Sequence, residues 1–247
     1  MRLRDRAAIV TGAASGIGAA TARLFAQEGA QVLAVDLPGK GLGKVHDEEP
    51  RIAILEKSVA DHDAAEVIVE TCRRQFGGID IVMNNAGVGS NALAEAMPIE
   101  VWDRIFAVNV RAPFLICQKA IPSLKDSKAG RIINVASVMA EGTDYGLSAY
   151  CASKAGVAGL TRTLALELGK FGITANYLLP GAIKTGMTAP LWEAQPHVAD
   201  IWAKKSVLRR LGAPIDLARG ALFLASDDGG FVTGHGLNVD GGLMLRV

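Results

Sequence analysis

Residues 7–18 read AAIVTGAASGIG, a short apolar run that passes directly into a glycine-rich turn. After the turn, small and apolar residues recur at helical spacing at positions 17, 20, 21, 24 and 25, and the pattern stops at Gly29. Residues 31–35 are again apolar and typical of a strand. The order of strand, turn, helix and strand predicts a βαβ unit.

The rest of the chain repeats this alternation. Further strands are predicted at residues 52–55, 79–83, 131–136, 174–179 and 237–239, and helices at 63–76, 98–123 (one long helix or a pair), 150–169 and 217–225. Alternating strands and helices predict a parallel sheet covered on both faces, because each crossover must be right-handed. The predicted fold class is α/β, a single Rossmann-like doubly wound domain over residues 1–247 with about seven strands.

Composition and charge limit the possible partners. The chain has 247 residues, half of them hydrophobic, with 26 Lys plus Arg against 25 Asp plus Glu. Such a balance gives no broad attraction to nucleic acid or to an anionic membrane. No apolar run reaches the roughly 18 residues that a membrane-spanning helix needs. We therefore expect no nucleic acid and no membrane partner, and a cytoplasmic location by default.

Cysteines and histidines show no metal-binding pattern. The three cysteines, at positions 72, 117 and 151, form no CxxC motif, and an odd scattered set is typical of a reducing compartment. The four histidines, at positions 46, 62, 197 and 235, have no ligand spacing with cysteines or acidic residues. We expect no metal site.

The glycines of the first turn are typical of a dinucleotide site. Gly12 allows a tight turn at the strand end, Gly16 lets the backbone approach a pyrophosphate, and Gly18 permits close packing of the helix. The helix N-terminus, with Ser15 and Ile17 in the turn, is then placed to hold the phosphates. The spacing is GxxxGxG rather than GxGxxG, and a turn needed only for chain geometry is the alternative.

An acidic residue, Asp36, ends the second predicted strand. A carboxylate at this place accepts hydrogen bonds from the adenosine ribose hydroxyls and repels a 2′-phosphate. Neither Ser15 nor Leu37 is basic, so the usual cation for a 2′-phosphate is missing from those positions. The sequence predicts NAD as the cofactor; Lys40 and Lys44 in the following loop are the counter-argument.

Tyr150 and Lys154 lie four residues apart in a predicted helix. Residues at this spacing share one helix face, with Cβ atoms about 5–6 Å apart. A neighbouring ammonium stabilises a phenolate, so we expect the pKa of Tyr150 to fall toward neutral pH. The pair is a candidate general acid/base.

In combination, these motifs resemble those of the classical short-chain dehydrogenase/reductases, over essentially the whole chain. The matching residues are the stretch from Thr11 to Gly18, the NNAG run at residues 84–87, Asn109, Ser137, Tyr150 with Lys154, and Pro180-Gly181 followed by Ile183 and Thr185. The resemblance implies an oxidoreductase that interconverts a secondary alcohol and a ketone by hydride transfer.

The resemblance also implies roles for four catalytic residues. Tyr150 would exchange a proton with the substrate oxygen, and Ser137 would hydrogen-bond the same oxygen. Lys154 would bind the nicotinamide ribose as well as lower the pKa of the tyrosine. Asn109 would hold a water that connects Lys154 to solvent, through a local distortion of its helix.

Further residues would contact the cofactor. The resemblance implies that Asn85, Ala86 and Gly87 support the sheet and the cofactor, and that Ile183 and Thr185, after Pro180 and Gly181, hold the nicotinamide carboxamide. Ser58 and Val59 replace the usual Asp-Val pair beside adenine. A serine hydroxyl can still bond the adenine ring, whereas Asp61 could do so only if the loop shifts.

The substrate walls would map onto Val88, Gly89, Val138, Met139 and residues 143–147, and onto a substrate-binding loop at residues 184–210. That loop contains Met187, Leu191, Trp192 and Trp202, which favours an apolar, aromatic or cyclic small-molecule alcohol or ketone. The two tryptophans could equally be core or subunit contacts.

Two alternative functions remain open. The first is a 3-oxoacyl thioester reductase acting on acyl carrier protein or coenzyme A. Asp36 argues against it, and so does Phe171, which occupies a position that is often basic in reductases of carrier-bound substrates. The second is a non-catalytic dinucleotide sensor or scaffold, a class that usually lacks catalytic residues. The resemblance further implies a homotetramer with interfaces on the helices near residues 100–124 and 150–169 and on the C-terminal strand.

Overall fold

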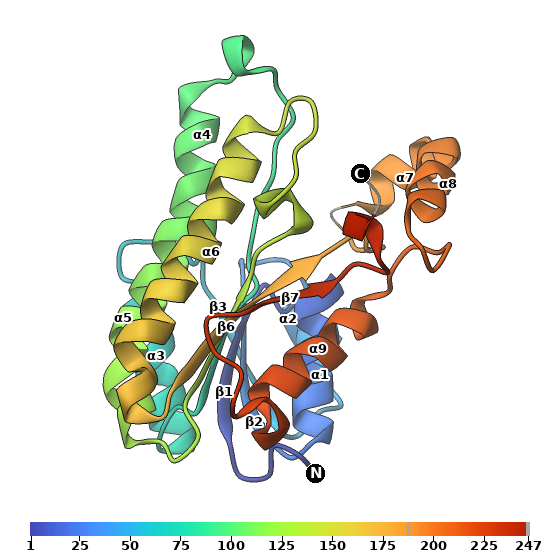
Figure 1. The fold of residues 1–247 in the computed structure, drawn as a ribbon. Coiled ribbons are helices and arrows are strands. Elements are labelled where there is room, and N and C mark those ends of the chain that lie inside the picture. Colours follow the sequence, from blue (N-terminus) through green and yellow to red (C-terminus); the bar gives the residue numbers. More distant parts are fainter. Residues whose placement is uncertain (187, 246–247) are drawn as a thin grey trace.

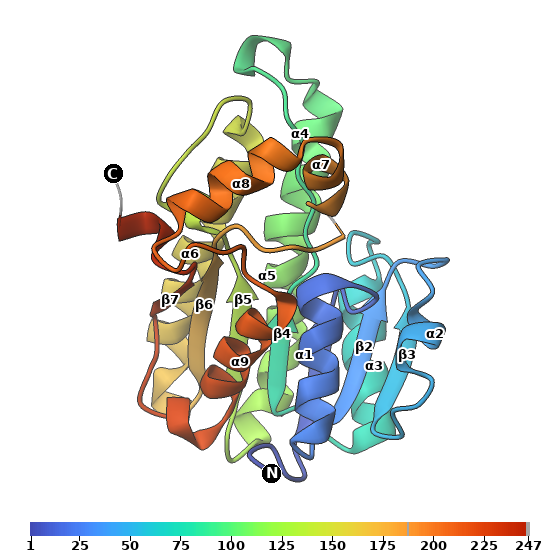
Figure 2. The same cartoon turned by 90° about the vertical axis from the view of Figure 1, so that its right-hand side faces the viewer.

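The computed structural model describes residues 1–186 and 188–245, which form a seven-stranded parallel sheet with helices on both faces (Figures 1 and 2). The strand order is β3-β2-β1-β4-β5-β6-β7, so the chain reverses its direction of growth between β1 and β4. Doubly wound folds bind ligands at the carboxyl ends of the strands beside such a reversal. The strands are β1 (Ala7–Thr11), β2 (Gln31–Asp36), β3 (Ile52–Glu56), β4 (Ile81–Asn84), β5 (Arg131–Val135), β6 (Thr174–Pro180) and β7 (Gly236–Val239).

Two layers of helices cover the sheet. On one face lie α1 and α9, seen in front of the strands in Figure 2; on the other lie α3, α5 and α6 (Figure 1). None of the helices in the described ranges is long and apolar enough to cross a membrane. The helices are α1 (Gly16–Gln27), α2 (Leu42–His46), α3 (Ala64–Phe76), α4 (Ile99–Phe106), α5 (Ala112–Asp126), α6 (Ser148–Leu168), α7 (Ala189–Ala194), α8 (Pro196–Lys205) and α9 (Pro214–Ala225).

The predicted α/β fold is confirmed, and the predicted strands all form with boundaries shifted by a few residues. Of the two alternatives predicted for residues 98–123, the structure has the helix pair, α4 and α5, joined by a π-helical turn, η2 (Ala107–Arg111). Two local predictions were incomplete. The segment expected to be a loop at residues 184–210 contains α7 and α8, and α2 was not predicted.

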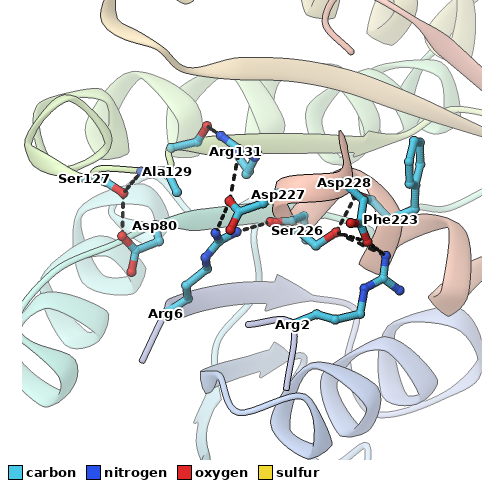
Figure 3. Close-up of polar contacts among 12 residues, drawn as sticks. Arg2, Arg6, Asp80, Ser127, Ala129, Arg131, Phe223, Ser226, Asp227 and Asp228 are labelled. Carbon is cyan, nitrogen blue, oxygen red and sulfur yellow. Dashed lines mark hydrogen bonds and ion pairs between the residues drawn. The ribbon is translucent and has the colours of Figure 1, made fainter. Parts of the chain in front are cut away.

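Charged side chains close the amino end of the sheet, opposite the edge where β1 and β4 end. In Figure 3, Arg2, Arg6 and Arg131 point toward Asp227 and Asp228. Arg2 pairs with Asp228, Arg6 pairs with Asp227, and the buried Arg131 places its guanidinium 3.7 Å from the same Asp227 carboxylate. The cluster joins the N-terminal segment, the start of β5 and the segment after α9, and leaves the carboxyl edge of the sheet free for a site.

Candidate active site

The glycine-rich turn after β1 is fastened to the end of β4. The Asn85 side-chain amide donates to the carbonyl oxygens of Thr11 (2.9 Å) and Gly12 (3.1 Å). The backbone N–H groups of Asn85 and Ala86 both donate to the Thr11 hydroxyl oxygen at 3.0 Å. Asn85 and Ala86 thus fix the shape of the turn.

The three glycines of the turn leave space that side chains would fill. Gly12 has φ +68°, and a Cβ there would lie 2.8 Å from the Asn85 amide nitrogen. Gly16 has φ +54°, and its Cβ would lie 3.2 Å from the Thr185 Cβ atom. A Cβ on Gly18 would lie 2.0 Å from the Gly12 carbonyl oxygen. A bare backbone turn at the N-terminus of α1 fits the diphosphate of a dinucleotide.

A pocket of about 550 Å³ opens above this turn and runs along the carboxyl ends of the strands. It is lined by every residue predicted to contact the cofactor except Gly18, which packs the start of α1 against the turn. The lining residues from that prediction are Gly12, Ser15, Gly16, Ile17, Asp36, Ser58, Val59, Asn85, Ala86, Gly87, Tyr150, Lys154, Pro180, Gly181, Ile183 and Thr185. Ser137 also lines the pocket, whereas Asn109 does not.

Asp36 lies at one end of this pocket, at the end of β2. Its carboxylate accepts hydrogen bonds from the Ala14 N–H (2.8 Å) and the Leu37 N–H (2.7 Å), so its orientation is fixed. Ser58 and Val59, just beyond the neighbouring β3, line the same end. Asp61 forms an ion pair with Lys57 at 3.0 Å, which keeps that carboxylate occupied.

Asn109 lies in the π-helical turn η2, so the predicted local distortion of its helix is present. Its side-chain oxygen accepts from the Val88 N–H (2.9 Å), and its amide donates to the Val88 carbonyl (2.9 Å) and the Ser153 hydroxyl (3.0 Å). A methyl group placed on Gly87 would lie 3.4 Å from Lys154 Nζ and 3.5 Å from Asn109 Oδ1. Gly87 therefore keeps open the space between these two side chains, where the predicted water would sit.

Tyr150, Ser137 and Lys154 meet at the other end of the pocket. Lys154 is buried, and its ammonium donates to the Val135 carbonyl at 2.8 Å and lies 5.7 Å from the centre of the Tyr150 ring. Ser137 follows β5, and its hydroxyl oxygen accepts from the Met139 N–H at 3.1 Å. The Tyr150 phenol, the Ser137 hydroxyl and the Lys154 ammonium thus lie together at this end of the pocket.

The prediction that the pKa of Tyr150 falls toward neutral pH was wrong for the protein by itself. Burial raises the pKa of Tyr150, and the interaction of its phenol with the Ser137 hydroxyl only partly opposes that rise. Burial also lowers the pKa of Lys154 to about 8. The physical reason is that both groups lose solvent, while the ammonium is directed at a backbone carbonyl rather than at the phenol oxygen.

Several known proteins are similar to this chain along nearly its whole length. Residues 12–244 match the sequence family described as enoyl-(acyl carrier protein) reductase. A 3-oxoacyl-(acyl-carrier-protein) reductase FabG of Thermotoga maritima is 39% identical over 99% of this chain and 100% of its own. A (3R)-3-hydroxyacyl-CoA dehydrogenase of Rattus norvegicus is 39% identical over 99% and 98% of the two chains. A 2,5-dichloro-2,5-cyclohexadiene-1,4-diol dehydrogenase LinX of Sphingobium indicum is 37% identical over 100% and 99%.

The chain belongs to the short-chain dehydrogenase/reductase family. The predicted family and the predicted class, an oxidoreductase acting between alcohol and carbonyl, are confirmed. Members of this family use a nicotinamide dinucleotide, and the bare turn and the pocket fit one. In residues 1–186 and 188–245 of the enzyme, no group of three or more His, Cys, Asp or Glu side chains is arranged to hold a metal ion.

Apolar side chains of the enzyme gather beyond Ser137. Val138 belongs to a buried apolar cluster, and Met139, Trp202 and Met244 pack against that cluster. Val88 lines the pocket itself, and a Cβ on Gly89 would lie 3.5 Å from the Tyr150 ring. Trp192 is buried. Met187 and the side chain of Leu191, which were also predicted as substrate wall, lie outside the described part of the structure.

The sequence reasoning missed pocket residues in the segment after β6. Thr188 lines the pocket, and its hydroxyl donates to the Ile183 carbonyl at 2.7 Å and accepts from the Thr185 N–H at 3.0 Å. These bonds close a turn that brings Ile183 and Thr185 against the pocket. The spacing of two threonines three residues apart was the available signal, since hydroxyl side chains stabilise such turns.

Proposed function

We propose that the enzyme is an NAD-dependent alcohol dehydrogenase or ketone reductase whose substrate is apolar, aromatic or cyclic. The observation that carries the proposal is the layout of the pocket at the carboxyl ends of the strands. Asp36 stands at its adenosine end, and Tyr150, Ser137 and Lys154 converge at the other. The substrate would lie beyond Ser137, beside the apolar cluster that contains Met139 and Trp202.

Tyr150 and Ser137 would handle the substrate oxygen. When bound, NAD supplies hydride transfer at nicotinamide C4. In the reducing direction the Tyr150 hydroxyl donates its proton to the carbonyl oxygen, while the Ser137 hydroxyl donates a hydrogen bond to that same oxygen. In the oxidising direction Tyr150 accepts the proton of the alcohol. Because burial raises the pKa of Tyr150, the phenol of the cofactor-free protein carries the proton that it would donate.

Other site residues would hold the nicotinamide and its ribose in place. They are Lys154, Asn109 and the residues after β6. Lys154 binds the hydroxyls of the nicotinamide ribose and passes a proton toward Tyr150, with a water between its ammonium and Asn109. Ile183 and Thr185 bind the carboxamide. The open space beside Gly87 supports the water position, and the Thr188 bonds support the carboxamide contact.

Asp36 would select NAD. We expect Asp36→Asn to raise the ratio of kcat/KM with NADPH to kcat/KM with NADH by about tenfold or more, because the charge that repels a 2′-phosphate is removed. Asparagine can still accept the Ala14 hydrogen bond, so the turn should persist. The measurement is initial rates with both cofactors. Asp47→Asn, an exposed carboxylate at the end of α2, serves as the control that should leave the ratio unchanged.

A 3-oxoacyl thioester reductase is the second candidate, because relatives along the full chain carry that activity in their names. Phe171 is exposed, and the surface around it still carries positive charge, because Lys125 Nζ lies 4.1 Å and Lys170 Nζ lies 5.2 Å from its ring centre. Initial rates across aryl ketones, cyclic ketones, steroids and acetoacetyl thioesters separate the two. Turnover of a bulky ketone with NADH supports the first proposal, and turnover of thioesters alone supports the second.

Exposed apolar side chains support the proposed homotetramer. Leu166 on α6 is 85% exposed, Phe114 on α5 is 42% exposed, and Phe231 before β7 is fully exposed. Large apolar groups on a surface commonly mark contacts between chains. We expect Leu166→Glu to reduce the assembly to a smaller species in sedimentation velocity at micromolar concentration, and Ile201→Glu on α8 to leave it intact. A wild-type enzyme that sediments as a monomer would contradict the proposal.

A further inference from the structure

The short helix α2 buries a histidine that the proposed reaction does not use. α2 lies beside β2 and β3 (Figure 2), and its two buried residues are Leu42 and His46, one turn apart. His46 is 4% exposed. Its ring Nε2 lies 2.9 Å from the carbonyl oxygen of Ala13, in the glycine-rich turn, and its Nδ1 is buried without a hydrogen-bond partner in the described part of the chain.

One peptide group connects His46 to Asp36. The peptide between Ala13 and Ala14 has its carbonyl oxygen against His46 Nε2 and its N–H against the Asp36 carboxylate, at 2.8 Å. A peptide group is planar, so fixing the direction of its carbonyl also fixes the direction of its N–H. The contact with His46 and the hydrogen bond to Asp36 therefore both depend on the orientation of this one rigid group.

The contact with the Ala13 carbonyl determines which ring nitrogen of His46 carries a proton. A carbonyl oxygen only accepts, so Nε2 must carry the proton. Burial lowers the pKa of His46, and the positive charge of Arg23 on α1 acts in the same direction; the Ala13 contact and the charge of Glu49 oppose them. Near neutral pH the ring is therefore neutral, with Nε2 as its single donor.

We propose that His46 is a positioning residue for cofactor selection, which holds the Ala13–Ala14 peptide so that Asp36 presents its carboxylate to the adenosine ribose. The inference rests on the proposed NAD-dependent function. It assigns part of the preference for NAD to a side chain that touches neither the reacting atoms nor the ribose.

The test combines two variants at position 46 with a substitution at a second site, Asp36. His46→Leu removes the donor and keeps an apolar side chain, whereas His46→Gln retains a side-chain N–H that can reach the Ala13 carbonyl. His46→Leu is also made on an Asp36→Ala background, since residues that act through each other are non-additive. The readouts are the dissociation constants of NADH and NADPH by fluorescence titration, and the thermal midpoint without cofactor.

We expect His46→Leu to raise the dissociation constant of NADH about tenfold, a value typical of breaking a buried hydrogen bond, and to leave that of NADPH within about twofold. His46→Gln should restore most of the NADH affinity. On the Asp36→Ala background the leucine substitution should change neither constant by more than about twofold. A lower thermal midpoint of His46→Leu is compatible with the proposal, because the proposal concerns cofactor binding.

Several outcomes would overturn the inference. An equal loss of NADH and NADPH affinity would show that His46 stabilises the glycine-rich turn for either cofactor. An undiminished effect of His46→Leu on the Asp36→Ala background would rule out action through Asp36. If His46→Leu is insoluble, His46→Met takes its place; insolubility of both beside a folded His46→Gln would assign the residue to folding alone. A wild-type enzyme without preference for NADH, or a preference insensitive to Asp36→Ala, would instead overturn the proposed function.

Discussion

Tyr150→Phe is expected to lower kcat by about 10²–10⁴-fold while leaving the dissociation constant of NADH nearly unchanged. Phenylalanine keeps the ring that packs beside Gly89 and Lys154 but removes the hydroxyl that exchanges a proton with the substrate oxygen. Ser137 remains, yet its hydroxyl hydrogen-bonds the substrate oxygen and does not supply the proton. The loss should therefore appear in the chemical step and not in cofactor binding.

The measurement is steady-state and single-turnover hydride transfer, together with a fluorescence titration of NADH. Tyr145→Phe is the matched control, because Tyr145 lies in the loop before α6 with 87% of its surface exposed. That variant should keep wild-type rates. If Tyr150→Phe retained more than about a tenth of the wild-type kcat, the acid/base role of Tyr150 would have to be abandoned.

Lys154→Met is expected to lower kcat/KM by about 10²–10⁴-fold, with KM for NADH rising as well. Burial already raises the pKa of Tyr150. Removing the neighbouring positive charge disfavours the phenolate, so the pKa of Tyr150 is expected to rise further. Proton uptake by Tyr150 from an alcohol then becomes harder, and alcohol oxidation should suffer more than ketone reduction. Comparing both directions in the variant checks this asymmetry.

The same variant should change how stability depends on pH. The pKa of Lys154 in the folded protein is about 8, below the ordinary lysine value of 10.5, so folding favours the neutral amine. The wild-type free energy of unfolding should thus fall as pH decreases from 10.5 to 8, by roughly 3 kcal/mol at about 1.4 kcal/mol per pKa unit. Methionine does not titrate and should abolish this component.

Chemical denaturation of the cofactor-free protein at pH 7 and pH 10.5 measures the effect. Lys125→Met, which removes a lysine from the surface beside Phe171, is the control and should keep the wild-type pH dependence. The same pH dependence in Lys154→Met as in the wild type would show that Lys154 is solvated and charged in the folded state.

Local sequence rules were sufficient for the fold and the glycine-rich turn, and the family resemblance added most of the other predicted pocket residues. The run into Gly12, Gly16 and Gly18 demands a turn that only small residues allow, and Asp36 follows at the end of the next strand. Parallel strands place their carboxyl ends at one edge, so residues after β1, β2, β4, β5 and β6 had to meet there. The places of the strand-end residues were thus predictable from the βα alternation, whereas their proposed roles rested on the family resemblance.

Features that depend on packing were not predictable. α8 leaves its residues exposed or half-buried, so residues 196–205 carry no strong apolar period. His46 looked like an isolated polar residue, because nothing in its neighbourhood in the sequence indicates that it meets Ala13. The pKa values of Tyr150 and Lys154 depend on burial that the i, i+4 spacing does not reveal.

In the proposed reaction, hydride passes between NAD and a carbonyl carbon at the Tyr150 end of the pocket. The most direct measurement is incubation of the enzyme with NADH deuterated at C4 and a panel of aryl, cyclic and steroid ketones, followed by mass spectrometry of the alcohol. We expect one deuterium on the carbinol carbon with the wild type, and about 10²–10⁴-fold less labelled alcohol with Tyr150→Phe over the same time. Tight NADH binding without deuterium transfer to any ketone or acetoacetyl thioester would contradict it and indicate a dinucleotide sensor.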